Sequence, residues 1–326
     1  MWANQTETEE DGIREEAIRR TKIRFHFKQS VERAKLMQET IMNENQLLIN
    51  HTDYLRNYLI KNSIDEIVAK QIQLYLSNQF TYCRNLTFKK KLGGFHRVTV
   101  NSRVNEGNNI RIVDVCKLKY PPNGASKNGR ANLIGEKILY ATDDFITALK
   151  EARVKEGDLI TISTWRLKTG EALTFTPIFK NWPQESNLLN IEFLKLKNEY
   201  FKIIKKLDQN QQYQIETFIQ FLTDCFTKKV EDSNHFDYFL SSFYANKLLN
   251  ILQNGEIDAI LYPSSKENLV TTNIAMKHTV FEENYELFCV EEKVVELIAK
   301  GKHRYFEFKP ISESKIFIEE KIIWND

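Results

Sequence analysis

Five polar residues of the chain could together act on a nucleotide: Arg97, Arg130, Tyr140, Glu151 and Ser264. An arginine guanidinium bonds two oxygens at once, so Arg97 and Arg130 are suited to a diphosphate. Tyr140 offers its π face to a flat cationic ring such as nicotinamide. Glu151 is the kind of carboxylate that stabilises the electron-poor sugar carbon formed as an N-glycosidic bond breaks. The residue types therefore favour chemistry at a glycosidic bond.

Each of these residues also has an ordinary structural explanation. Arg97 could pack its stem on a strand with its head in water, and Tyr140 could be a core tyrosine with a satisfied hydroxyl. Glu151 could pair with a cation on its own helix. Ser264 and its neighbour Ser265 could shape the turn that follows a proline. That these side chains meet in space is a hypothesis from residue type alone.

Two asparagines are further candidates for binding the substrate. Asn132 follows Arg130 in a glycine-containing loop, so that an amide and a guanidinium stand close together in the sequence. Asn273 lies in the stretch TTNIAM, where it is a weaker candidate for orienting a dinucleotide. The alternative for Asn273 is a loop cap.

The bulk composition favours a globular protein of the cytoplasm. The 326 residues are 42% hydrophobic and 28% charged, with a formal net charge of +2, which gives no electrostatic footprint for nucleic acid. The N-terminus is acidic without an apolar signal segment, and no apolar run is long enough to span a membrane. The four cysteines are far apart, so the sequence predicts reduced thiols and no metal site.

The order of predicted elements indicates an α+β protein in two parts. Residues 1–88 have helical apolar spacing, and Ser63 followed by Glu66 is a capping pattern, so we expect an all-α N-terminal bundle. Two glycines then break this pattern, and short β-branched runs predict a mixed β domain over 89–326. Its predicted strands cover 95–100, 110–118, 137–142, 159–167, 258–263, 285–290, 304–309 and 315–324, and its predicted helices cover 144–152, 236–253 and a helical insertion at about 186–230.

Three separated stretches of the sequence resemble the RES-domain family, which is named for an arginine, a glutamate and a serine in that order. The stretches are GFHRVT, GRAN-x5-ILYATDD-x2-TALKEAR and GEIDAILYPSS-x7-NIAM, and they cover about residues 93–290. Arg97, Glu151 and Ser264 fall on the three name-giving residues. The choice of Ser264 over Ser265 rests on the alignment to the YPS triplet.

The resemblance implies an ADP-ribosyltransferase-like fold and an enzyme that degrades NAD+. The nicotinamide–ribose bond would be cleaved by hydrolysis or by phosphorolysis, with NAD+ as the substrate, inorganic phosphate as a potential co-substrate and no cofactor. Tyr140 matches the tyrosine of the family's LY pair, and Arg130 lies in its GR turn. Many members are toxins restrained by an antitoxin protein, which implies a toxin or defence effector. Two alternatives stay open: a protein ADP-ribosyltransferase, and a catalytically silent module that binds NAD+ or RNA.

The N-terminal helices resemble the HEPN-type segment that precedes some RES domains. HEPN ribonucleases need the pattern R-x4–6-H on one helix, whereas here His51 precedes Arg56. We therefore expect a sensing, docking or restraining role for this segment rather than RNA cleavage. The sequence is compatible with a homo-oligomer.

Overall fold

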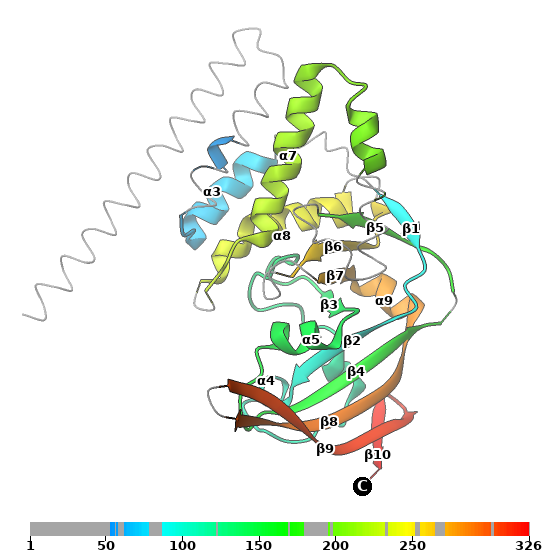
Figure 1. Cartoon of the computed structure of the whole chain (residues 1–326). Coiled ribbons are helices and arrows are strands. Elements are labelled where there is room, and N and C mark those ends of the chain that lie inside the picture. Colours follow the sequence, from blue (N-terminus) through cyan, green and yellow to red (C-terminus); the bar gives the residue numbers. More distant parts are fainter. Residues whose placement is uncertain are drawn as a thin grey trace, which may run out of the picture.

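The computed structural model describes residues 53–55, 57, 62–77, 87–121, 123–168, 170–178, 195, 198–231, 234–251, 255–264, 271–300 and 303–325. Over these ranges the protein is a mixed α+β structure, as the sequence predicts, built on one sheet with helices against both faces (Figure 1). The helices predicted before residue 53 lie outside the described residues, as do His51 and Arg56.

The sheet of the described chain has ten strands in the order β1-β5-β6-β7-β3-β2-β4-β8-β9-β10. Among the described strands, β5 and β6 pair in parallel, and all other neighbouring strands are antiparallel. Strands β2 and β3 are joined at a single residue pair. The strands are β1 (Phe88–Lys90), β2 (Gly94–Val100), β3 (Ile138–Thr142), β4 (Leu159–Leu167), β5 (Leu173–Pro177), β6 (Ala259–Pro263), β7 (Thr272–Lys277), β8 (Tyr285–Lys300), β9 (His303–Ile318) and β10 (Lys321–Asn325).

The sheet is nearly divided between β3 and β2. These strands share the single register pair His96↔Thr142, whereas β2 pairs with β4 along its whole length, from Gly94↔Arg166 to Val100↔Ile160. Two strands that are joined at one pair diverge on either side of it, and the gap leaves room for side chains. The gap opens between the C-terminal half of β2 and β3, which is where the candidate residues Arg97 and Tyr140 lie.

Helices cover the two faces of the sheet. They are α3 (Glu66–Ser77), α4 (Asn101–Val104), α5 (Phe145–Ala152), α7 (Gln209–Thr227), α8 (Phe239–Asn246) and α9 (His278–Asn284), with 3-10 turns at Val115–Leu118 and His235–Tyr238 and a π-helical turn at Lys247–Ile251. In Figure 1, α3, α7 and α8 gather at the top of the view and the long strands β8 and β9 lie at the bottom, with β2, β3 and α5 between them. None of the described helices has both the length and the apolar composition needed to cross a bilayer.

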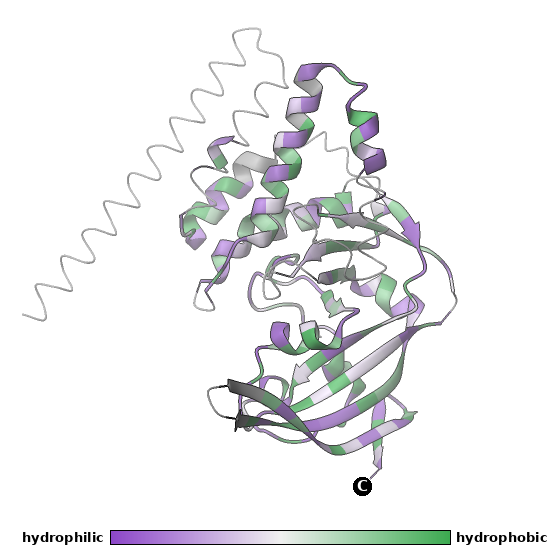
Figure 2. Ribbon diagram, viewed as in Figure 1, coloured by the Kyte–Doolittle hydropathy of each residue, from purple (hydrophilic) through white to green (hydrophobic). Residues whose placement is uncertain are grey.

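The strand residues alternate between two hydrophobic cores. In β3, Ile138 and Tyr140 contribute to the core beneath α7 and α8. Leu139 and Ala141 belong to the core on the opposite face of the sheet, which also contains Phe281 of α9. Successive side chains of a strand point to opposite faces, so one short strand serves both cores. Apolar and polar bands alternate along α7 in Figure 2, as expected for a helix that buries one side.

The N-terminal segment shares a core with the helices of the predicted insertion. Ile64 and Ile72 are fully buried in the cluster that also contains Phe221 of α7. The backbone amide of Ile64 donates to Asp237 Oδ1 at 2.8 Å. Helix α3 begins after Asp65, whose Oδ1 accepts from the amide of Val68 at 2.8 Å; Asp65 therefore caps the helix, and the capping role expected for Ser63 is wrong.

Two predicted strands are not single strands in the structure, and two others, 285–290 and 304–309, are only parts of the longer β8 and β9. Residues 110–118 are not a strand but an isolated bridge at Asp114 followed by the 3-10 turn. Ile112, Val115 and Leu118 are buried while Val113 is 47% exposed, which is a period of three rather than the period of two that a strand requires. The predicted single strand 315–324 is instead the end of β9, a turn and β10.

The turn that divides 315–324 is formed by Glu319 and Glu320, which both have positive φ, 49° and 61°. Two such residues between antiparallel strands make a tight hairpin, usually with Asn and Gly at these positions. Strands β1, β5 and β7 were not predicted, and β7 contains the stretch for which a loop was considered at Asn273.

Candidate active site

Helix α5 carries Glu151 and is fixed at its N-terminus by a side-chain cap. The carboxylate of Asp144 accepts from the amide of Thr147 at 2.6 Å and from its hydroxyl at 2.7 Å. This cap supplies one of the acceptors that the first turn of any helix lacks. The helix packs against β2 and β3, so Glu151 in its last turn faces the gap between the two strands.

An arginine from α4 holds the other end of α5. The guanidinium of Arg103 donates to the carbonyl of Ala152 at 2.6 Å and to that of Arg153 at 2.9 Å. The last carbonyls of a helix have no partner within the helix, and a cation is favourable there. Arg153 ends the helix with left-handed backbone, φ 49°. The position of Glu151 is thus fixed from both ends of a short helix.

The carboxylate of Glu151 accepts two hydrogen bonds on the same oxygen. Ser264 Oγ donates to Oε1 at 2.6 Å, and Asn273 Nδ2 donates to Oε1 at 2.7 Å. Within the described chain, Oε2 of Glu151 has no hydrogen-bond partner. The two donors therefore orient the carboxylate and leave one oxygen for a ligand.

Ser264 contacts Glu151 from behind the cavity. Its side chain is fully buried and is absent from the cavity lining, whereas Asn273 belongs to the lining. The backbone amide of Ser264 donates to the carbonyl of Thr271 at 2.8 Å, which fixes the residue at the end of β6. The structure thus places Ser264 as a support of Glu151, and Ser265 lies outside the described residues.

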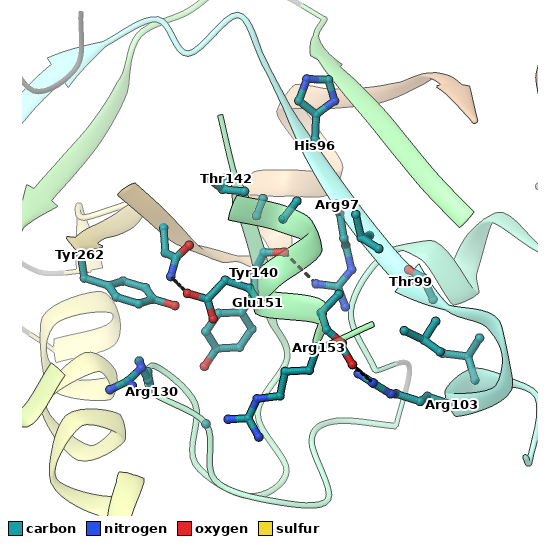
Figure 3. Close-up of a pocket in the computed structure, with 18 of the residues that line it drawn as sticks. His96, Arg97, Thr99, Arg103, Arg130, Tyr140, Thr142, Glu151, Arg153 and Tyr262 are labelled. Carbon is teal, nitrogen blue, oxygen red and sulfur yellow. Dashed lines mark hydrogen bonds between the residues drawn. The ribbon is translucent and has the colours of Figure 1, made fainter. Parts of the chain in front are cut away.

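Arg97 is a half-buried cation whose one hydrogen bond within the described chain goes to a neutral group. One Nη donates to the carbonyl of Tyr140 at 2.7 Å across the gap between β2 and β3, while the buried Nε has no partner (Figure 3). Arg97 forms no ion pair with any residue that the structure describes. Burial lowers the pKa of Arg97 to about 10, because a charged guanidinium loses its hydration there. An uncompensated buried cation is costly for folding, and an anionic ligand would offset that cost.

Tyr140 is held by the loop that precedes it. Its hydroxyl donates to Asn132 Oδ1 at 2.8 Å and accepts from the amide of Ala131 at 2.8 Å. Burial raises the pKa of Tyr140 well above its usual value, so the phenol stays neutral. A Cβ at Gly129 would collide with both Asn132 and Tyr140, which explains the glycine of the GRAN stretch.

Asn132 therefore acts on Tyr140 and does not line the cavity. Its amide nitrogen donates to the carbonyls of Lys127 and Leu133, and its side chain is buried. Arg130, in the same loop, does line the cavity. Its guanidinium donates to the carbonyl of Phe226 at 2.6 Å and lies 5.1 Å from the ring centre of Tyr238.

Two tyrosines of the site were not among the residues singled out from the sequence. Tyr262 and Tyr238 line the same cavity as Glu151. Tyr262 is directly opposite Asn273 in the β6–β7 ladder, and Asn273 is opposite Thr142 in the β3–β7 ladder, so the three side chains share one face of the sheet. Tyr262 could have been inferred from its position in the predicted strand AILYP. It lies two residues before Ser264, and side chains two residues apart on a strand point to the same face.

These residues surround one cavity of about 820 Å³. This volume is within the range of small-molecule and cofactor sites and is large enough for an extended ligand. Of the seven residues singled out from the sequence, five line the cavity and two support it from behind; the five are Arg97, Arg130, Tyr140, Glu151 and Asn273, and the two are Ser264 and Asn132. Arg103, Arg153, Tyr238 and Tyr262 are additional polar lining residues.

Among the described residues there is no group of three His, Cys, Asp or Glu side chains that could hold a metal ion. Cys116, Cys225 and Cys289 are free thiols, and Cys83 lies outside the described ranges. Comparison with protein-family models and with curated proteins finds no match to this chain.

Proposed function

We propose that the protein degrades NAD+ by cleaving the bond between nicotinamide and ribose. The observation that carries the proposal is that Glu151 and Arg97 line one cavity: the carboxylate is held by two donors, and the half-buried guanidinium has no anionic partner among the described residues. The substrate has a cationic half and an anionic half, joined by a ribose. The two charged side chains are complementary to these halves.

The carboxylate is suited to the charge that develops during bond cleavage. As the bond between ribose C1′ and the nicotinamide nitrogen breaks, its electron pair passes to the ring, and the ribose becomes an oxocarbenium-like cation. The oxygen Oε2 of Glu151, which accepts no hydrogen bond from a described residue, would lie against this cation. A fixed negative charge in a cavity shielded from water stabilises such a state more strongly than it stabilises the substrate.

The remaining side chains position the substrate. The ring of Tyr140 would stack against nicotinamide, with Tyr262 beside it, and Arg97 would hold the diphosphate with help from Arg130. Ser264 and Asn273 would keep Glu151 in place during the reaction. Water attacking C1′ gives ADP-ribose, nicotinamide and a proton, whereas phosphate attacking the same carbon gives ADP-ribose 1″-phosphate, nicotinamide and a proton.

We further propose that the fold is of the ADP-ribosyltransferase-like type, since a sheet divided at β2 and β3 suits a dinucleotide held in the gap. An enzyme that consumes NAD+ would harm its own cell, so a toxin or defence role in the cytoplasm requires restraint. An antitoxin protein or the N-terminal helices could provide it. Helix α3 packs in the same core as α7 and α8, and the amide of Ile64, just before α3, donates to Asp237. The next residue, Tyr238, lines the cavity, and this supports a link between the N-terminal segment and the cavity.

The purified full-length protein, incubated with NAD+ with and without phosphate, tests the proposal when the products are identified by mass. We expect release of nicotinamide, and loss of at least about 100-fold in kcat for Glu151→Gln, because removal of one electrostatic stabiliser costs that much in comparable sites. The matched control is Glu156→Gln, an exposed carboxylate outside the cavity. Full activity of Glu151→Gln, or no consumption of NAD+ by the wild type, would contradict the proposal. In a parallel incubation with labelled NAD+, a labelled protein band would instead identify a protein ADP-ribosyltransferase.

A further inference from the structure

A turn of four residues places one side chain at the cavity and has little of its own to hold it there. The 3-10 turn His235–Tyr238 ends at Tyr238, which lines the cavity. None of its four residues is fully buried, and no side chain caps its first amides. Hydrogen bonds within a short 3-10 turn have poor geometry. The position of this turn therefore depends on its contacts with other parts of the chain.

One side of the turn contacts the loop that carries Arg130. Residues three apart in a 3-10 turn lie on the same side, as His235 and Tyr238 do. The amide of Asn128 donates to His235 Nδ1 at 3.4 Å, and the guanidinium of Arg130 lies 5.1 Å from the ring centre of Tyr238. A guanidinium at this distance from an aromatic ring is attracted to it. The turn thus positions two lining residues, Tyr238 directly and Arg130 through the ring of Tyr238.

Asp237 of the same turn is bound to the N-terminal segment. Its Oδ1 accepts from the amide of Ile64 at 2.8 Å and from Lys228 Nζ at 3.0 Å. Lys228 Nζ also donates to the carbonyl of Asn62 at 2.9 Å. The side chains of Lys228 and Asp237 are only 14% and 12% exposed, and charge-assisted hydrogen bonds shielded from water are strong. Both members of this ion pair therefore hold the backbone just before α3.

The segment that Asp237 binds is fixed in the hydrophobic core beside α7 (Figure 1). Ile64 and Ile72 are fully buried in the core that contains Phe226, and the carbonyl of Phe226 accepts from Arg130 at 2.6 Å. No residue of the described ranges within 53–77 lines the cavity. This part of the N-terminal segment therefore supports the cavity wall from behind.

We propose that Asp237 is a positioning residue and that residues 62–77 are a working part of the active site. Bound to this segment, the turn keeps Tyr238 and Arg130 in the arrangement that binds the dinucleotide. The inference rests on the function proposed above, and it gives this part of the N-terminal segment an activating role rather than a restraining one. Loosening the contact lowers the fraction of molecules that are competent to bind, and the apparent affinity falls by the same factor.

The experiment removes the acceptor of Asp237 in the full-length protein. In Asp237→Ala, the KM for NAD+ should rise about tenfold, the size of one charge-assisted hydrogen bond. The kcat should change much less, because the donors that hold Glu151 are untouched. Asp237→Asn keeps an acceptor for the amide of Ile64 and should recover part of the loss. Lys228→Met should also raise KM, since it removes the bond to Asn62 and leaves Asp237 without its cation.

Asp258→Ala is the matched control, because it removes an aspartate with the same kind of bond away from the turn. Asp258 Oδ2 accepts from the amide of Thr174 at 2.7 Å, just before β6. This variant should lower the Tm and leave KM unchanged. An unchanged KM in Asp237→Ala, or an equal rise in both variants, overturns the inference and leaves Asp237 a role in stability alone. Faster cleavage of NAD+ by Asp237→Ala also overturns it, because the segment would then act as a restraint.

Hydrogen exchange of the unliganded proteins separates this inference from the catalytic proposal. The amides of Gly129 and Ala131, on either side of Arg130, are hydrogen-bonded in the wild type. They should exchange faster in Asp237→Ala than in Asp258→Ala, because the loop loses the support of the turn. If exchange changes in this way but the wild type does not consume NAD+, the supporting role stands and the catalytic proposal fails. Equal exchange in the two variants overturns the inference, whether or not NAD+ is cleaved.

Discussion

Ser264 Oγ lies 2.6 Å from Glu151 Oε1, although 113 positions separate the two residues in the sequence. Asn273 donates to the same oxygen from the neighbouring strand. Three elements, the end of α5, the end of β6 and the start of β7, thus meet at one carboxylate oxygen. The orientation of the Glu151 carboxylate therefore depends on donors from two strands of the sheet as well as on the helix that carries Glu151.

Ser264→Ala should reduce kcat more than it raises KM. The serine contacts the carboxylate and not the cavity, so its loss should free Glu151 to rotate without removing a contact to the substrate. Hydrogen bonds to charged groups contribute about 1.5–3 kcal/mol, which corresponds to about 10- to 100-fold in kcat. Steady-state kinetics measure both constants. Ser312→Ala is the control, since this hydroxyl donates only to a backbone carbonyl near the C-terminus. A change in KM alone would show that Ser264 contacts the substrate directly.

Arg97→Met should stabilise the unliganded protein while abolishing binding of the dinucleotide. The wild type carries a half-buried guanidinium whose pKa burial lowers to about 10, so Arg97 stays charged at neutral pH but its charge is less favourable in the folded state than in the unfolded chain. An apolar side chain of similar length removes this cost, for a gain of about 1–3 kcal/mol in the free energy of unfolding. Urea denaturation measures the change. Pyrophosphate should raise the Tm of the wild type and leave that of Arg97→Met unchanged; a less stable variant would show that the guanidinium has an anionic partner in the free protein.

Tyr140→Phe and Tyr140→Ala should separate the two roles of this residue. The phenylalanine variant keeps the ring but leaves the buried amide of Ala131 and the Oδ1 of Asn132 without the hydroxyl, so we expect a loss of about 1–3 kcal/mol in stability with activity largely kept. The alanine variant should lose stability and also the ring that stacks on nicotinamide, and so its KM should rise. Thermal melting and kinetics on both variants check this. Equal activity of the two variants would exclude stacking by Tyr140.

His96 should make the protein less stable in mild acid. Burial lowers the pKa of His96 below its model-peptide value, with Glu291 and Asp144 opposing the shift, so protonation of His96 favours the unfolded chain. Its contribution to stability is fully present above about pH 6.5, the ordinary value, and is lost as the pH falls from there through the lower pKa of the folded state. Urea midpoints between pH 5 and 8 measure the effect. His96→Gln should show a smaller decline over that interval, and an unchanged decline would assign it to other groups.

The sequence predicted the elements whose pattern is local. Strand β4 has the predicted bounds, and β2, β3 and α5 differ by one residue from the predicted ranges, because short alternating runs and a helix between Asp144 and Arg153 have clear ends. The run 110–118 was wrong because its β-branched residues suggested a strand although its buried positions repeat every third residue. The hairpin between β9 and β10 was missed because Glu319 and Glu320 adopt a turn usually made by other residues.

The site was predictable by residue type but not by role. Residue types indicated Arg97 and Glu151, yet their shared cavity depends on pairing between distant strands, which no local pattern encodes. The contact of Ser264 with Glu151 could not be predicted, since it requires the register of β6 and β7. Asn132 was expected to contact the substrate, whereas its amide is fully occupied by Tyr140 and two carbonyls. Arg103 and Arg153 lie outside the residue set considered and are identified by the fold.

The lone ladder pair His96↔Thr142 has an evolutionary consequence. Arg97 of β2 and Tyr140 of β3 lie on opposite sides of the gap, and the spacing of the two strands is set by their pairing with β4 and β7, of which only Asn273 lines the cavity. Substitutions in these supporting strands can widen or narrow the space without altering any residue that contacts the occupant. Descendants of this chain could thus acquire new occupants while every residue at the cavity wall stays the same.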